Sequence, residues 1–92
     1  MINYKEFNEL NRKEKLIFID NSATKIDAIF PWTGNISIVT IYSLFDFFVE
    51  IVCIIETEKI TEIIGFNNVN YLNKYPQYFD NIKREIYLRI SV

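Results

Sequence analysis

The sequence predicts an α+β fold: a four-stranded, mainly antiparallel sheet with an N-terminal helical region and a C-terminal helix. Three observations predict this fold. Apolar residues recur at helical spacing near both ends of the 92-residue chain, they alternate through its middle, and only short turn-like segments separate the alternating runs. Because a parallel strand pair needs a long crossover, the short connections favour antiparallel neighbours. A chain of this length forms a single domain, residues 1–92.

Two capping boxes in succession predict the helical region over residues 3–20. Asn3 is followed three residues later by Glu6, and Asn11 is followed in the same way by Glu14. At this spacing each of the two side chains bonds the backbone N–H of the other residue at a helix start. The second box therefore predicts a break in the helical region at Asn11.

The alternating pattern predicts four strands, over residues 25–32, 36–44, 47–56 and 60–66. Strict alternation places Ile26 and Ile29 on opposite faces of the first strand, and Ile60 and Glu62 on the same face of the fourth. The third strand is mainly apolar on both faces, which a sheet open to water on one side would not need. Either helices cover both of its faces, or one face meets another molecule.

The pattern of the C-terminal quarter predicts helical structure. Residues 69–75 predict a helical turn or short helix, and Pro76 suits the first position of a further helix. That helix has an apolar stripe at helical spacing, made by Phe79, Ile82, Ile86 and Ile90. The last six residues, YLRISV, are equally compatible with a short strand.

The composition excludes several kinds of active site. The chain has no histidine, one cysteine and two glycines. It therefore lacks the residues for a disulfide scaffold, a Cys/His zinc site, a histidine base or a glycine-rich phosphate loop. Cys53 lies in an apolar run and is expected to be a buried cysteine that behaves as a small hydrophobe. The sequence predicts a protein that is not an enzyme and needs no cofactor or metal.

The charge distribution points to a protein partner. The net charge is −2, but residues 26–66 carry six acidic residues and one lysine, and no basic residue lies between Ile26 and Glu58. Direct nucleic-acid binding would need a basic stripe and is disfavoured. An acidic middle suits a basic partner surface, although a solvated face would have the same bias.

A membrane location is not expected. Residues 36–55 include fifteen apolar residues in twenty, yet Asp46 and Glu50 lie near the centre of this stretch. A carboxylate there costs about 2.5–3.5 kcal/mol on insertion scales. The first residues lack the apolar core of a signal peptide, so a cytoplasmic setting is expected.

Glu50 is the least expected residue, because apolar neighbours surround it in the sequence. A buried, unpaired carboxylate is costly, so Glu50 must reach water, a cation or a hydrogen-bond donor. One account places it at an exposed position, and the other makes it a polar anchor in an interaction surface. Acidic side chains and amphipathic aromatic side chains make up the candidate partner-binding residues, which are Asp46, Glu50, Glu56, Glu58, Glu62, Trp32 and Tyr42.

Two motifs resemble a group of short, uncharacterised bacterial proteins. The first is an F..L...EK helix and the second is a YS…FFVE strand pair, and together they span about two-thirds of the chain. The matching residues are Phe7, Leu10, Glu14, Lys15, Tyr42, Ser43, Phe47, Phe48, Val49 and Glu50. The C-terminal helix does not match the pattern, and the resemblance implies no activity.

In size, charge and lack of a catalytic set, the chain is also similar to anti-CRISPR proteins, other phage-borne inhibitors of defence nucleases and toxin-neutralising immunity proteins. The hypothesis is thus a protein-binding inhibitor of a bacterial defence nuclease or similar effector with a basic groove. A structural homodimer or assembly subunit, which pairs through the doubly apolar sheet, or a toxin-neutralising immunity protein is the first alternative. A small carboxylate enzyme is the second, since Asp46 with Glu50, or Glu56 with Glu58 and Glu62, would suit Mg²⁺.

Overall fold

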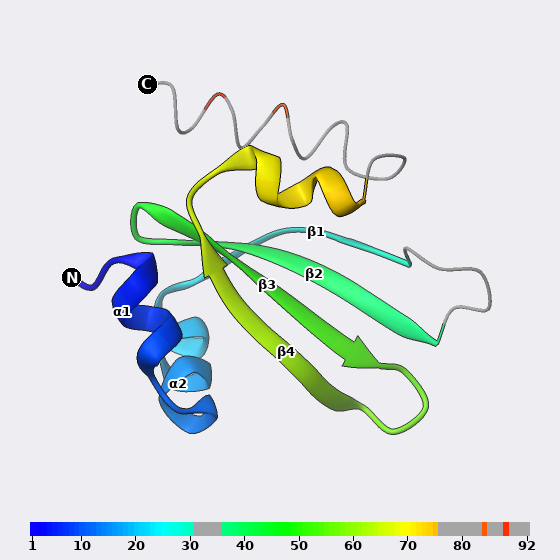
Figure 1. Cartoon of the computed structure of the whole chain (residues 1–92). Helices are drawn as coiled ribbons and strands as arrows, with labels where there is room; N and C mark the ends of the chain where they lie inside the picture. The colour runs from blue at the N-terminus through cyan, green and yellow to red at the C-terminus, as the bar shows by residue number, and fades with distance from the viewer. Residues whose placement is uncertain (31–35, 76–83, 85–87, 89–92) are drawn as a thin grey trace.

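The computed structural model describes residues 1–30, 36–75, 84 and 88, and it confirms the small α+β fold (Figure 1). The described elements are, in order, α1 (Tyr4–Glu9), α2 (Arg12–Ser22), β1 (Thr24–Ile29), β2 (Ser37–Leu44), β3 (Phe47–Ile54), β4 (Lys59–Phe66) and the 3₁₀-helix η1 (Val69–Lys74). The C-terminal helical element of the described chain is therefore a short 3₁₀-helix. The longer helix expected from Pro76 lies outside the described residues, except for Arg84 and Leu88.

The sheet is a simple meander. Its strands lie in the order β1-β2-β3-β4, and each pairs antiparallel with its neighbour, as the short connections predicted. Residues Phe45 and Asp46 turn the chain between β2 and β3 at one end of the sheet. Residues 55–58 turn it between β3 and β4 at the other end.

The two capping boxes form as predicted and separate α1 from α2. The Asn3 side chain accepts from the Glu6 N–H at 2.8 Å, and Glu6 accepts from the Asn3 N–H at 3.1 Å. The Asn11 and Glu14 pair repeats this arrangement at 2.9 and 3.2 Å. Each pair satisfies two N–H groups that a helix start leaves free, so the chain begins a new helix at Arg12.

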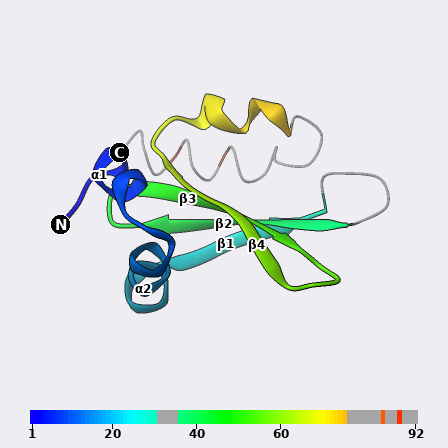
Figure 2. The same ribbon diagram turned by 60° about the horizontal axis from the view of Figure 1, so that its bottom comes forward.

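Helices lie on both sides of the sheet (Figure 2). We call the side that carries α1 and α2 the helix face, and the side that carries η1 the η face. On the helix face Phe7 packs against Phe47 with ring centroids 5.5 Å apart. On the η face Leu72 and Tyr75 join a cluster with residues of β2, β3 and β4. Residues Phe47–Val52 of β3 are all buried. For this part of the strand, the first of the two alternatives, that helices cover both of its faces, is thus confirmed.

Two β-bulges overturn the strict alternation expected for the outer strands. The register of β1 shifts between Lys25 and Asp27, and Ile26 and Ile29 consequently both pack on the η face. The register between β3 and β4 shifts next to Val52, so that Ile60 pairs with Cys53 while Glu62 pairs with Val52. Ile60 and Glu62 therefore lie on opposite faces. A bulge adds one residue to a strand and reverses the alternation beyond it.

Candidate protein-binding surface

The described helices leave part of the helix face uncovered. The helices α1 and α2 lie near the β2–β3 turn, and the sheet extends past them toward the β3–β4 turn (Figure 1). Ile38, Cys53 and Ile60 pair directly across β2, β3 and β4, so their side chains share this face. All three are partly exposed, so the expectation that Cys53 is buried is wrong. At the end of this row Ile36 is 61% exposed and Ile55 is 39% exposed.

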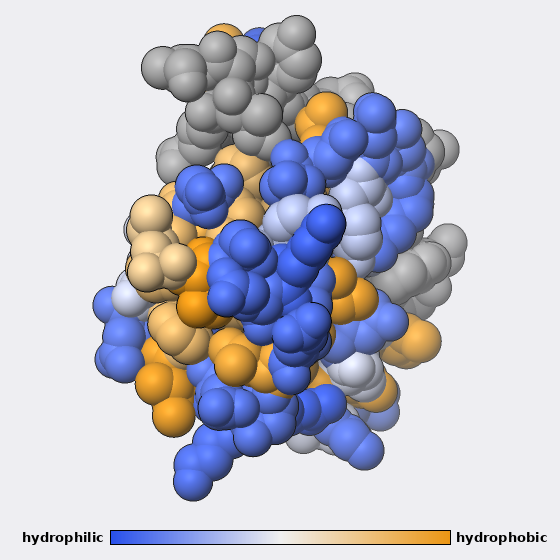
Figure 3. Space-filling view, turned by 60° about the vertical axis from the view of Figure 1, so that its left-hand side comes forward, coloured by the Kyte–Doolittle hydropathy of each residue, from blue (hydrophilic) through white to orange (hydrophobic). Residues whose placement is uncertain are grey.

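The Ile55 N–H donates to the Ile36 carbonyl at 3.0 Å, which holds these two residues side by side. We call Ile36, Ile38, Cys53, Ile55 and Ile60 the sheet-end patch. Figure 3 shows the end of the molecule at which α1 and α2 lie, and there polar and apolar side chains are interspersed.

Two of the predicted acidic residues adjoin the sheet-end patch. Glu56 and Glu58 follow Ile55 in the β3–β4 turn and are exposed, and Lys59 comes next at the start of β4. Glu58 has a positive φ of 56°, a conformation that tightens the turn and is uncommon for a residue other than glycine. An apolar patch with carboxylates at its border has the composition of a protein interface with a polar rim.

The other predicted residues that the structure describes lie away from this surface. Asp46 is exposed at the opposite end of the sheet, where it lines a shallow pocket of about 330 Å³ with residues that include Asn3 and Lys5. Glu62 lies on the η face, and Tyr42 is partly buried against the core of the helix face. Trp32 lies outside the described residues. The candidate residues are thus distributed over both faces and both ends of the sheet.

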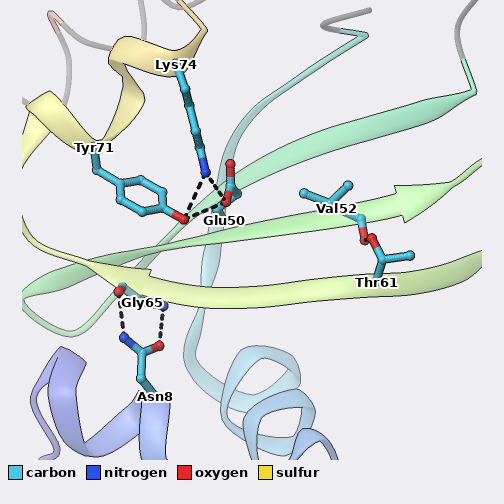
Figure 4. A network of polar contacts seen from close by, with 7 residues as sticks. All are labelled: Asn8, Glu50, Val52, Thr61, Gly65, Tyr71 and Lys74. Atoms are coloured by element: carbon cyan, nitrogen blue, oxygen red, sulfur yellow. Dashed lines mark hydrogen bonds and ion pairs between the residues drawn. The ribbon is translucent and has the colours of Figure 1, made fainter.

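Glu50 is 0% exposed, so the account that places it at an exposed position is wrong. Its Oε1 accepts from the Tyr71 hydroxyl at 2.8 Å and from Lys74 Nζ at 3.0 Å (Figure 4). Lys74 Nζ also donates to the Tyr71 hydroxyl at 3.1 Å. The lysine side chain is 42% exposed and reaches inward from the surface. The cation and the donor that Glu50 requires are both supplied by η1.

The tyrosines of this cluster remain protonated as donors. Burial, followed by the hydrogen bond to Glu50 and its negative charge, raises the pKa of Tyr71 well above its usual range. The same causes raise the pKa of Tyr75. Lys74 Nζ lies 4.1 Å from the centroid of the Tyr71 ring and 5.3 Å from that of Tyr75, within the range of a cation–π contact. A carboxylate enclosed in this way anchors η1 and offers no access to a substrate.

Within the described residues, no three His, Cys, Asp or Glu side chains come close enough together to hold a metal ion. None of the described helices has the length and apolar character needed to span a membrane. No protein-family model, curated protein or solved structure matches the chain. The resemblance to short bacterial proteins therefore stays a prediction.

Proposed function

We propose that this chain is a non-enzymatic binding protein that occupies the surface of a bacterial effector, such as a defence nuclease, and inhibits it. The sheet-end patch carries this proposal, because it places exposed aliphatic side chains next to Glu56 and Glu58. Desolvated apolar contacts give an interface most of its affinity, while complementary charge speeds the encounter. A nuclease groove that holds phosphates is basic and would complement the two carboxylates.

A pull-down from the native host with matched variants tests the proposal. Immobilised wild type is compared with Ile36→Thr/Ile55→Thr, since threonine suits an exposed strand or turn position. The control is Ile17→Thr, which removes a side chain of the same type that is 51% exposed on α2. Proteins retained by wild type and by the control, but lost from the double variant, are identified by mass spectrometry.

The retained protein is then purified and its nuclease activity assayed with and without this chain. The proposal expects wild type and Ile17→Thr to suppress that activity, and the double variant to require a concentration about tenfold higher or more. Equal retention and equal inhibition by the double variant would show that the sheet-end patch is not the binding surface. Retention of a protein whose nuclease activity this chain does not change would show that the chain is not its inhibitor.

A further inference from the structure

The outer edge of β4 is already bonded by side chains of the two helices. Asn8 donates through Nδ2 to the Gly65 carbonyl at 2.9 Å and accepts from the Gly65 N–H at 2.7 Å (Figure 4). Lys15 Nζ donates to the Ile63 carbonyl at 3.0 Å. These backbone groups are the ones that an added strand would bond. A partner strand therefore cannot pair with this part of β4 without displacing Asn8 and Lys15.

The other edge strand, β1, is protected in a different way from pairing with an added strand. The Asp27 carboxylate accepts from the Ala28 N–H at 2.7 Å, which removes one donor from an incoming strand. The bulge between Lys25 and Asp27 interrupts the regular spacing of β1, and both of these charged residues are exposed. Bulges and charges on an edge strand discourage pairing with another chain. A binding partner is thus directed to a face of the sheet.

On the helix face, α-helices already pack against these strands. α1 and α2 bring Phe7 and Ile19 onto the buried half of this face, where Val49 and Ile63 belong to the same cluster. The sheet-end patch continues that face with aliphatic side chains and has no described helix on it. A third helix, supplied by another molecule, would complete the layer by the same packing.

The negative charge at the border of the patch indicates which side chains that helix carries. Glu56 and Glu58 adjoin Ile55, so basic side chains flanking the apolar stripe of the helix would complement them. A second copy of this chain fits less well. In a symmetric contact through the patch, each copy would bring Glu56 and Glu58 to the border of the interface, so the two surfaces would carry like charge there instead of complementary charge.

We infer that the sheet-end patch accepts a basic amphipathic helix of the partner, with its apolar stripe on the patch and its cationic side chains beside Glu56 and Glu58. This inference rests on the proposed function and specifies the segment that the partner presents. It is one of the established ways in which proteins recognise helical peptides.

Three synthetic peptides of roughly 18 residues, long enough to form a helix, test the inference. The first combines leucine and lysine at helical spacing, the second replaces each lysine with glutamate, and the third is a scrambled form of the first. Binding is followed by NMR chemical shifts of the full chain in the backbone amides and in the methyl groups of the patch isoleucines. The first peptide should bind at least about tenfold more tightly than either of the others. Its largest shifts should fall on Ile36, Ile38, Ile55 and Ile60.

Variants show whether that binding is specific. Ile36→Thr/Ile55→Thr should weaken binding of the first peptide by about tenfold or more, while Ile17→Thr should leave it unchanged. Glu56→Gln/Glu58→Gln should weaken binding and reduce its dependence on salt. Amide spectra of each variant establish that it remains folded.

Four results would overturn the inference. Binding of the three peptides with similar affinity would show that the chain does not select a basic amphipathic helix. Shifts centred on another surface would show that the sheet-end patch is not the binding site. A stable dimer in light scattering across a dilution series, lost in Ile36→Thr/Ile55→Thr, would assign the patch to a second copy. If the peptides fail while the native partner still requires Ile36 and Ile55, the inference falls and the proposed function stands. If the peptides bind while partner retention is insensitive to both residues, the sheet-end patch is not the surface that binds the native partner, and the proposed function loses the observation that carries it.

Discussion

Lys74 Nζ lies 3.0 Å from Glu50 Oε1, and this ion pair fastens η1 to the sheet. Glu50 stands in the middle of β3 and is fully buried, so its charge requires a partner. The partner comes from the last turn of η1, and Tyr71 donates to the same oxygen from the turn before. The residue that interrupts the most apolar strand therefore bonds two side chains of the segment after β4.

Removing the ammonium group should destabilise the fold. Lys74→Met keeps the length of the side chain but leaves Glu50 buried with Tyr71 as its donor, and we expect a loss of about 1–3 kcal/mol. Lys25→Met is the control, because Lys25 is exposed on β1, and it should change stability by less than about 0.5 kcal/mol. Urea unfolding measures both variants. In Glu50→Gln/Lys74→Met the total loss should be smaller than the sum of the two single losses. Additive losses would show that the two residues do not interact.

High pH should weaken the same cluster. The pKa values of Tyr71 and Tyr75 are raised in the folded chain, so above the usual tyrosine pKa of about 10 the unfolded chain releases protons that the folded chain keeps. Stability from these phenols is fully present below that pH and is lost as the pH rises above it. In Tyr71→Phe the urea midpoint should fall less steeply above about pH 10 than in wild type. Tyr42→Phe is the control and should keep the steep fall of wild type, and identical slopes in all three proteins would refute the prediction.

Gly65 allows α1 to lie close to β4. A Cβ placed there would meet Phe7 Cδ2 at 3.1 Å, Phe47 Cε2 at 3.3 Å and Asn8 Oδ1 at 3.4 Å. Gly65→Ala should therefore destabilise the chain by about 1–3 kcal/mol through overpacking. Phe7→Leu provides space next to the nearest of these atoms, so in the double variant the two losses should be less than additive. A neutral Gly65→Ala would indicate that α1 is free to move away from β4.

The regular parts of the fold could be predicted from local sequence patterns. The two capping boxes each involve residues three apart, and alternation identified all four strands and both faces of β3. The bulges in β1 and β4 could not be predicted this way, because alternation gives no sign of an extra residue. The donors to Glu50 lie 21 and 24 residues further along the chain, and Asn8 bonds a residue 57 positions away. Such contacts depend on how the elements pack, which one sequence does not reveal.

Acidic residues at different places should contribute unequally to partner binding. Glu56 adjoins the sheet-end patch, while Glu62 lies on the η face, so Glu56→Lys and Glu62→Lys change the total charge equally but at different sites. At low salt we expect Glu56→Lys to slow association with the captured partner by about tenfold, and Glu62→Lys by less than about twofold. Surface plasmon resonance at two salt concentrations measures both rates. Equal slowing by the two variants would mean that only the total charge matters.

Cys53 gives the most direct test of binding at the sheet-end patch. It is the only cysteine of the chain, its thiol is free, and it lies between Ile38 and Ile60 in the patch. The measurement is the rate at which N-ethylmaleimide alkylates Cys53 in the free chain and in the complex with the captured partner. A partner seated on the patch should slow alkylation by about tenfold or more, with normal rates restored when Ile36→Thr/Ile55→Thr prevents binding. An unchanged rate in a fully formed complex would contradict the account, because the partner would then be bound elsewhere.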